Sequence, residues 1–213
     1  DLAGLETPLP DRRPEFERSE IGYTADGGWR DADLYTPQTA GGNGARAGLV
    51  LVPGAAESGR RDYRLVEFAG ILARSGFAVL VPDIPSFREL RPSPNSAREI
   101  AEAVAQLRKA KAANGAPGNV PGKVPGIVLG DGLRLGIGAF SIASGPAVLA
   151  ALEADQYADS DAGPASRVDF LLLVGGYHDM RRTRTFMTTG FFEADGQPRQ
   201  REPDAYGKWV YSL

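Results

Sequence analysis

The residue of this sequence best placed for chemistry is a serine surrounded by small side chains. Ser141 lies in the segment Gly-Ala-Phe-Ser-Ile-Ala-Ser-Gly at 138–145, after an apolar run typical of a buried strand and before residues with helical spacing. A sharp turn from strand to helix leaves room only for small residues two positions away, where Ala139 and Ala143 stand. The pattern predicts a strained turn that exposes the Ser141 hydroxyl as a nucleophile. The alternative is that Ser141 caps the next helix.

A second candidate segment is the loop at 53–59, which reads Pro-Gly-Ala-Ala-Glu-Ser-Gly after an earlier apolar run. The spacing of Gly54 and Gly59 matches that of a phosphate-binding loop. However, Arg60 and Arg61 stand where binding of phosphate and Mg²⁺ requires Lys followed by Ser or Thr. Nucleotide binding is one alternative for this loop, and a tight connection without chemistry is another.

Three further polar residues follow apolar runs. His178, the single histidine of the chain, and Asp179 come after the run at 168–176. We weigh three roles for His178: lining a substrate pocket, acting as an improvised base with Asp179, or bonding locally as an ordinary loop residue. Asp83 is expected to hold a turn through its carboxylate.

The elements that would position these residues form an alternating series. Four runs that are apolar on both faces predict buried parallel strands ending near residues 54, 83, 141 and 176. The segments between them predict helices, the first at 62–75 and the second opening with the capping box Ser96 to Glu99. This order requires a parallel sheet with helices on both faces, and ligands of such sheets collect at the carboxyl ends of the strands. The expected core positions on the three helices are Leu65, Phe68, Ala69 and Leu72, then Ile100, Val104 and Leu107, then Ala147, Val148 and Ala151.

The remaining segments lie around this core. Residues 1–13 predict a surface arm, and two strands at about 16–24 and 29–36 predict an antiparallel hairpin at a sheet edge. The segment 109–133 is rich in Gly and Pro and is interpreted as a long excursion. Beyond Gly190 no strand or helix period is evident, so the expected core spans 14–190.

Composition excludes several classes of function. The chain has 213 residues, a net charge of -3 with both signs interspersed, and no cysteine. These features argue against a nucleic-acid partner, and with a single histidine they argue against a thiolate or His-rich metal site. No apolar run reaches the ~18 residues that span a bilayer. The chain begins at Asp1, which indicates that something upstream has been removed; the compartment and the oligomeric state stay open.

The sequence resembles the α/β-hydrolase superfamily over about residues 16–190, both in the predicted turn at Ser141 and in the order of its strands and helices. The nucleophile elbow of that family, G-x-S-x-G, has the relaxed form Ala139-Phe140-Ser141-Ile142-Ala143 here. The resemblance implies a serine esterase or lipase with a three-layer α/β fold. Such an enzyme would act on carboxylic esters or related acyl substrates through an acyl-enzyme on Ser141 and would need no cofactor.

The resemblance also implies which residues surround the substrate. The backbone N–H groups of Ile142 and Ala55 would form the oxyanion hole, with Pro53 in place of the histidine common in that loop. Gly54, Ala56, His178 and Asp179 would line the substrate site.

The resemblance leaves the C-terminal part of the fold unaccounted for. The family order is Ser, then Asp or Glu, then His, and the parallel strands of this chain stop near residue 176. We therefore expect an incomplete hydrolase whose base lies beyond Leu213, with 191–213 as the start of a lid and an open sheet edge. Arg181, Arg182 and Arg184 could cover that edge. Such a chain would turn over little alone. The alternative is a hydrolase-like domain without catalysis that serves as a binding module.

Overall fold

The computed structural model describes residues 15–25, 28–38, 45–91, 93, 95–112, 129–153, 168–203, 205, 207 and 208. The expected arm at 1–13 lies outside the described residues, as does the middle of the expected excursion at 109–133. Within the described parts of the chain, no helix is both long enough and apolar enough to cross a membrane.

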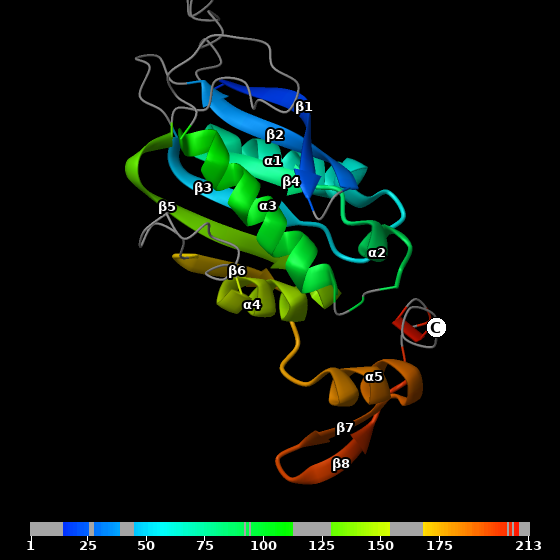
Figure 1. Ribbon diagram of the computed structural model, residues 1–213. Helices are drawn as coiled ribbons and strands as arrows, with labels where there is room; N and C mark the ends of the chain where they lie inside the picture. The colour runs from blue at the N-terminus through cyan, green and yellow to red at the C-terminus, as the bar shows by residue number, and fades with distance from the viewer. Residues whose placement is uncertain are drawn as a thin grey trace, which may run out of the picture.

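A six-stranded sheet in the order β1-β2-β4-β3-β5-β6 forms the centre of the fold (Figure 1). β1 and β2 pair antiparallel along their whole length, and β2 joins the rest of the sheet antiparallel to β4. The strands β4, β3, β5 and β6 are mutually parallel. The predicted edge hairpin and mostly parallel sheet are therefore confirmed. The strands span Glu15–Ala25 (β1), Gly28–Gln38 (β2), Ala45–Val52 (β3), Phe77–Pro82 (β4), Leu129–Phe140 (β5) and Phe170–Val174 (β6).

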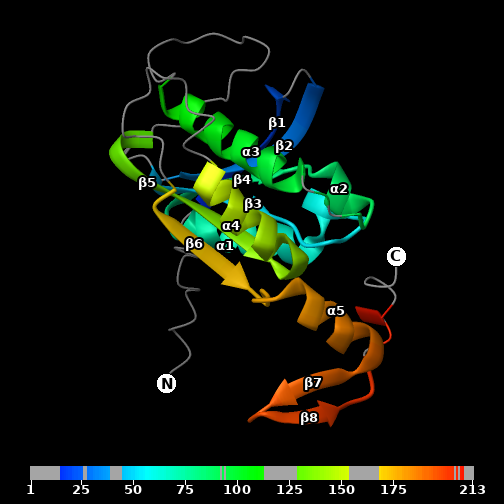
Figure 2. The same ribbon diagram turned by 60° about the horizontal axis from the view of Figure 1, so that its bottom comes forward.

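Helices cover both faces of this sheet, which gives the predicted three layers (Figure 2). Strand side chains alternate between the faces, so that Leu49 and Leu51 of β3 pack toward α1, while Val50 and Val52 pack toward α3 and α4. Short helical turns link strands to helices. The helical elements are η1 (Gly59–Arg61), α1 (Tyr63–Arg74), α2 (Pro85–Arg88), α3 (Asn95–Ala112), η2 (Ser141–Ala143), α4 (Ser144–Glu153) and α5 (Met180–Thr189).

The expected helix faces agree with the structure except on α4. Leu65 and Ala69 of α1 are buried, Phe68 and Leu72 are partly buried, and the three expected positions of α3 are fully buried. On α4, Ala147 and Ala150 are buried and Ala151 partly so, whereas Val148 is 38% exposed. The prediction for Val148 is wrong because the six-stranded sheet ends at β6, and the described residues place no further strand beside the outer side of α4.

The start of α3 also differs from the prediction. The helix begins at Asn95, one residue before the expected capping box. The hydroxyl of Ser96 is buried and accepts from the Ser93 N–H (3.1 Å) while lying 2.8 Å from the Ser86 hydroxyl. Ser86 also donates to Glu99 (3.2 Å). The residues expected to cap the helix therefore fasten α2 to α3.

Parts of two segments that were expected to be irregular form helix or strand. α3 continues through 109–112 and β5 begins at 129, so both ends of the expected excursion belong to core elements. Past Gly190, β7 (Phe191–Ala194) and β8 (Gln197–Gln200) form a hairpin where no strand was expected. Its turn is Asp195-Gly196, with φ of 57° and 70°. This Asp-Gly pair is the sequence signal that could have predicted the hairpin.

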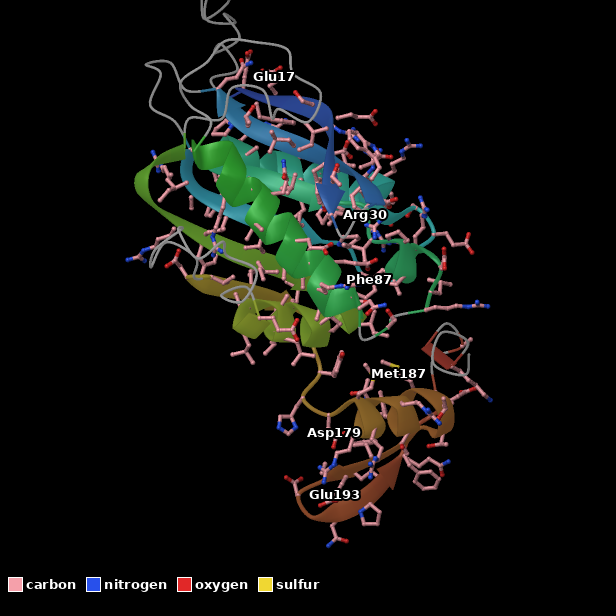
Figure 3. The ribbon with its side chains drawn as sticks, in the orientation of Figure 1. Glu17, Arg30, Phe87, Asp179, Met187 and Glu193 are labelled. Carbon is pink, nitrogen blue, oxygen red and sulfur yellow. The ribbon has the colours of Figure 1, made fainter. Side chains whose placement is uncertain are left out.

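The α5 helix and the β7–β8 hairpin lie apart from the sheet, on the side to which the parallel strand β6 points (Figure 2). Met187 points from α5 toward the sheet, whereas Glu193 lies on the hairpin (Figure 3). Among the described residues no strand pairs with the outer edge of β6, whose Leu171, Leu172, Leu173 and Val174 are 37–44% exposed. In the part of the chain that the structure describes, the sheet is open at this edge, as expected. The prediction that this apolar run forms a buried strand is therefore wrong, because no described strand covers its outer side.

Candidate active site

Ser141 occupies a sharp turn between β5 and α4. Phe140, the last residue of β5, is extended (φ -111°, ψ 139°), and Ser141 turns the chain with a φ of +51°. A positive φ is uncommon for residues other than glycine and strains the backbone. The Ser141 side chain is exposed, and Ser141 is the first residue of η2, with Phe140 at the N-cap position. The alternative that Ser141 caps the next helix therefore receives no support.

Neighbouring side chains hold this turn on both faces of the sheet. On the α1 face, the Phe140 ring packs edge-on against Phe68, with the ring centroids 5.7 Å apart. On the other face, the Tyr177 hydroxyl donates to the Ile142 carbonyl (3.3 Å). Tyr177 reaches this position because Gly145 has no side chain: a Cβ there would lie 2.9 Å from Cζ of the Tyr177 ring. Ala139 and Ala143 are buried beside the turn.

The loop after β3 lies against the same turn. β3 and β5 are neighbours, with Val52 beside Ala139 in register. A Cβ added at Gly54 would lie 3.4 Å from the Phe140 carbonyl oxygen and 3.8 Å from the Ser141 Cβ. The fold therefore brings Gly54 and Ser141 together, and Ala55 and Ala56 are partly buried in the same loop.

The nucleotide-binding alternative for this loop receives no support from the arginines that follow it. Arg60 is buried, and its guanidinium bonds to Asp33 of β2 (2.5 Å) and Glu20 of β1 (3.3 Å). The charge of Arg60 is thus neutralised by carboxylates of the β1–β2 hairpin and does not face a phosphate site in the loop. Arg61, the next residue, is exposed.

His178 and Asp179 do not form a pair with Ser141. His178 is exposed, and neither its imidazole nor the Ser141 hydroxyl makes a hydrogen bond with any described residue. Asp179 caps α5 by accepting from the N–H groups of Arg181 (2.8 Å) and Arg182 (3.2 Å). The hydrogen bond from the Arg182 backbone, followed by that from Arg181, lowers the pKa of Asp179. Within the described part of the chain, no base contacts the Ser141 hydroxyl.

Other features of the carboxyl rim are structural. The Asp83 carboxylate forms an ion pair with Arg88 (3.1 Å) at the turn after β4, which agrees with the expected role. Burial raises the pKa of Glu99, whose carboxylate accepts from Ser86.

The described residues contain no group of three or more side chains able to hold a metal ion. A hollow of about 720 Å³ lies between α5 and the β7–β8 hairpin, lined by Phe186, Phe191, Phe192 and Arg181 among others, and does not include Ser141.

Comparison with known proteins gives no match in sequence and many matches in structure. No protein-family model matches the chain, and no curated protein matches its sequence. The solved structures that resemble it include a fungal esterase from Rhizomucor miehei, with a TM-score of 0.57 and 11% identity over 94% of this chain and 55% of that one. A bacterial heroin esterase has a TM-score of 0.55 and 17% identity over 96% of this chain and 56% of the other.

The chain has an α/β-hydrolase-like fold. Brefeldin A esterase, a bacterial homologue of human hormone-sensitive lipase, also resembles it, with a TM-score of 0.51 and 19% identity over 76% of this chain and 40% of that one. This α/β-hydrolase-like chain spans 40% to 56% of the length of these three solved structures. At these identities the likeness concerns the fold alone.

Proposed function

We propose that this protein is a serine hydrolase that acts on carboxylic esters or related acyl substrates. The observation that carries the proposal is the exposed Ser141 at a positive φ, at the tip of a strand-to-helix turn in an α/β-hydrolase-like sheet. Non-glycine residues with this backbone strain concentrate at functional sites, and a turn of this kind presents the serine of the family to its substrate. The structural neighbours described as esterases support the class of reaction.

In the proposed reaction the Ser141 oxygen attacks the acyl carbon. The hydroxyl proton leaves to a base, and the departing alcohol takes up a proton to leave an acyl-enzyme. Water then attacks the acyl group and releases the acid. The backbone N–H groups of Ile142 and Ala55 would hold the oxyanion, each contributing about 3 kcal/mol to the transition state. The approach of Gly54 to within contact of Ser141 supports this pairing of loops.

The substrate would lie over the loop after β3, against Gly54 and Ala56. His178 and Asp179, on the segment between β6 and α5, would border the same rim. The reaction needs no metal or organic cofactor, because the serine supplies the nucleophile and backbone amides stabilise the charge. Because no base contacts Ser141 in the described residues, turnover by these residues alone is expected to be slow.

A fluorophosphonate probe tests the proposal even without an efficient base. Ser58 and Ser75 are also exposed and serve as internal controls in the same chain. We expect Ser141 to be phosphonylated about 100-fold faster than either, because an oxyanion hole and orientation alone can retain 10³–10⁴-fold catalysis. The rate should rise with pH and with added imidazole, which replaces the missing base, and labelling should vanish in Ser141→Ala.

The contrary outcome is equally clear. If the chain is folded by circular dichroism and Ser141 reacts no faster than Ser58 and Ser75 at any pH, the hydrolase proposal is wrong. The fold would then favour the alternative, a binding module that keeps the hydrolase scaffold without its chemistry.

A further inference from the structure

We infer that Arg60 is a positioning residue that fixes the loop at 53–58 against Ser141 by tying it to the edge hairpin. The inference rests on the proposed function, since the loop carries the proposed oxyanion donor Ala55. Arg60 itself contacts neither Ser141 nor a substrate position. It acts through the loop that precedes it.

The contacts of Arg60 form a buried bridge between separate elements. One nitrogen, Nη1, lies 2.5 Å from Asp33 Oδ1 and 3.3 Å from Glu20 Oε1. The side chain of Asp33 is 0% exposed and that of Arg60 is 8% exposed. The second oxygen of Asp33 accepts from Arg18 (3.0 Å). Both oxygens of the buried carboxylate are therefore paired, which a buried charge requires.

The hairpin needs a cation at this position. Glu20 of β1 and Asp33 of β2 stand directly opposite each other in the antiparallel register. Like charges in such cross-strand pairs destabilise a sheet. The positive charge of Arg60, which contacts both carboxylates through one nitrogen, offsets their mutual repulsion. The carboxylates of Glu20 and Asp33 in turn hold the Arg60 guanidinium in one position.

Packing of side chains holds only the start of the loop. Pro53 is buried, but Gly54, Ala55 and Ala56 are small and Glu57 and Ser58 are exposed. Such residues bury little apolar surface and cannot anchor a loop by packing. One end of the loop leaves β3, and the other enters η1 through the bond from the Gly59 N–H to the Ala56 carbonyl (2.9 Å). Arg60 follows Gly59 directly, so it sets the position of that end.

Hydrogen exchange tests this inference without any catalysis. The variants are Arg60→Met, which removes the charge, Arg60→Lys, which keeps it, and Arg61→Met as the matched control on the exposed neighbour. In Arg60→Met, we expect peptides spanning 53–59 to exchange at least tenfold faster, while those of α3 keep their protection. Arg60→Lys should recover most of the protection, and Arg61→Met should change nothing.

The fluorophosphonate reaction then tests the consequence at Ser141. A misplaced loop should lower the maximal rate of labelling about tenfold or more with little change in the probe's half-saturating concentration, because small misplacements in a site are costly. If the wild type labels and Arg60→Met labels equally fast, or if its loop exchanges no faster, the inference is wrong. If Arg60→Met does not fold, the same two outcomes are read from Asp33→Asn, which removes the charge of the buried carboxylate that holds Arg60. Failure of the wild type to label would instead contradict the proposed function, while the exchange result still decides the role of Arg60.

Discussion

Replacement of Ser141 by glycine should stabilise the protein, because the strain at this turn belongs to the backbone. An L-residue in the left-handed region costs roughly 1–2 kcal/mol, and glycine does not pay this cost. Glycine loses more conformational entropy on folding, by roughly 0.5–1 kcal/mol. At a φ of +51° the first effect exceeds the second. We expect Ser141→Gly to raise the free energy of unfolding by about 0.5–1 kcal/mol.

Replacement by alanine separates the backbone from the hydroxyl. Alanine keeps the Cβ and hence the strain, and the Ser141 hydroxyl makes no hydrogen bond with a described residue. Ser141→Ala should therefore leave the free energy of unfolding within about 0.5 kcal/mol of the wild type. A serine that capped the helix would behave differently, with Ala costing about 1 kcal/mol and Gly a few tenths.

Urea unfolding measures these differences, and the chain has no cysteine whose oxidation would complicate refolding. Ser75 provides a control at negative φ, since it is an exposed serine with a φ of -79°, where glycine relieves no strain. Glycine there brings its entropic cost and also removes the hydrogen bond from the Ser75 hydroxyl to the Ile71 carbonyl (2.9 Å). Ser75→Gly should thus be destabilising. If Ser141→Gly lowers stability as Ser75→Gly does, the strain attributed to Ser141 is absent and the main argument for its role fails.

Three further substitutions test the surroundings of this turn and the start of α1. Gly145→Ala should destabilise the wild type by about 1–2 kcal/mol through its clash with the Tyr177 ring, yet stabilise the Tyr177→Ala background by up to about 1 kcal/mol through helix propensity, which a double-mutant cycle measures. Ser144→Ala should raise the thermal midpoint, because the buried Ser144 hydroxyl has no partner among the described residues. Asp62 caps α1, and the hydrogen bond from the Arg64 side chain lowers the pKa of Asp62 from 3.8 to about 2. Its folded pKa lies below the unfolded value, so its contribution is present above pH 3.8 and is lost as the pH falls toward 2. In Asp62→Asn the slope of stability against pH should be smaller in that window, and an unchanged slope would contradict the assignment.

The sequence predicted the elements whose burial follows a simple period. The apolar runs at β3, β4 and β5 and the spacing of Ile100, Val104 and Leu107 reflect burial that is local to each element, and the structure confirms them. The run at β6 forms the expected parallel strand, but its side chains are exposed, so the prediction that it is buried is wrong. The turn at Ser141 was predictable as well, because the small residues that it requires, Ala139 and Ala143, lie only two positions away in the sequence. Val148 was not predictable in this way, since its exposure depends on the absence of a further strand beside β6 among the described residues.

The contacts that hold the candidate site were out of reach of the sequence. Arg60 meets carboxylates 27 and 40 positions away, and Tyr177 meets Ile142 at a separation of 35. Nothing in the local pattern indicates such partners, because an arginine in a loop is usually exposed. Ser96 and Glu99 matched the capping pattern but bond to Ser86 of α2 instead. Tertiary contacts here outweigh a local preference worth only about 1 kcal/mol.

The backbone strain of this turn is concentrated at one residue. Between Ala139 and Ala143 only Ser141 has a positive φ, and it carries a Cβ, which glycine would lack. Such strain persists only where the surroundings over-determine it. Phe140 is held against α1 on one face of the sheet, and the Ile142 carbonyl is held by Tyr177 on the other. The conformation of the turn at Ser141 therefore depends on contacts on both faces of the sheet, and loosening either one should relax the turn.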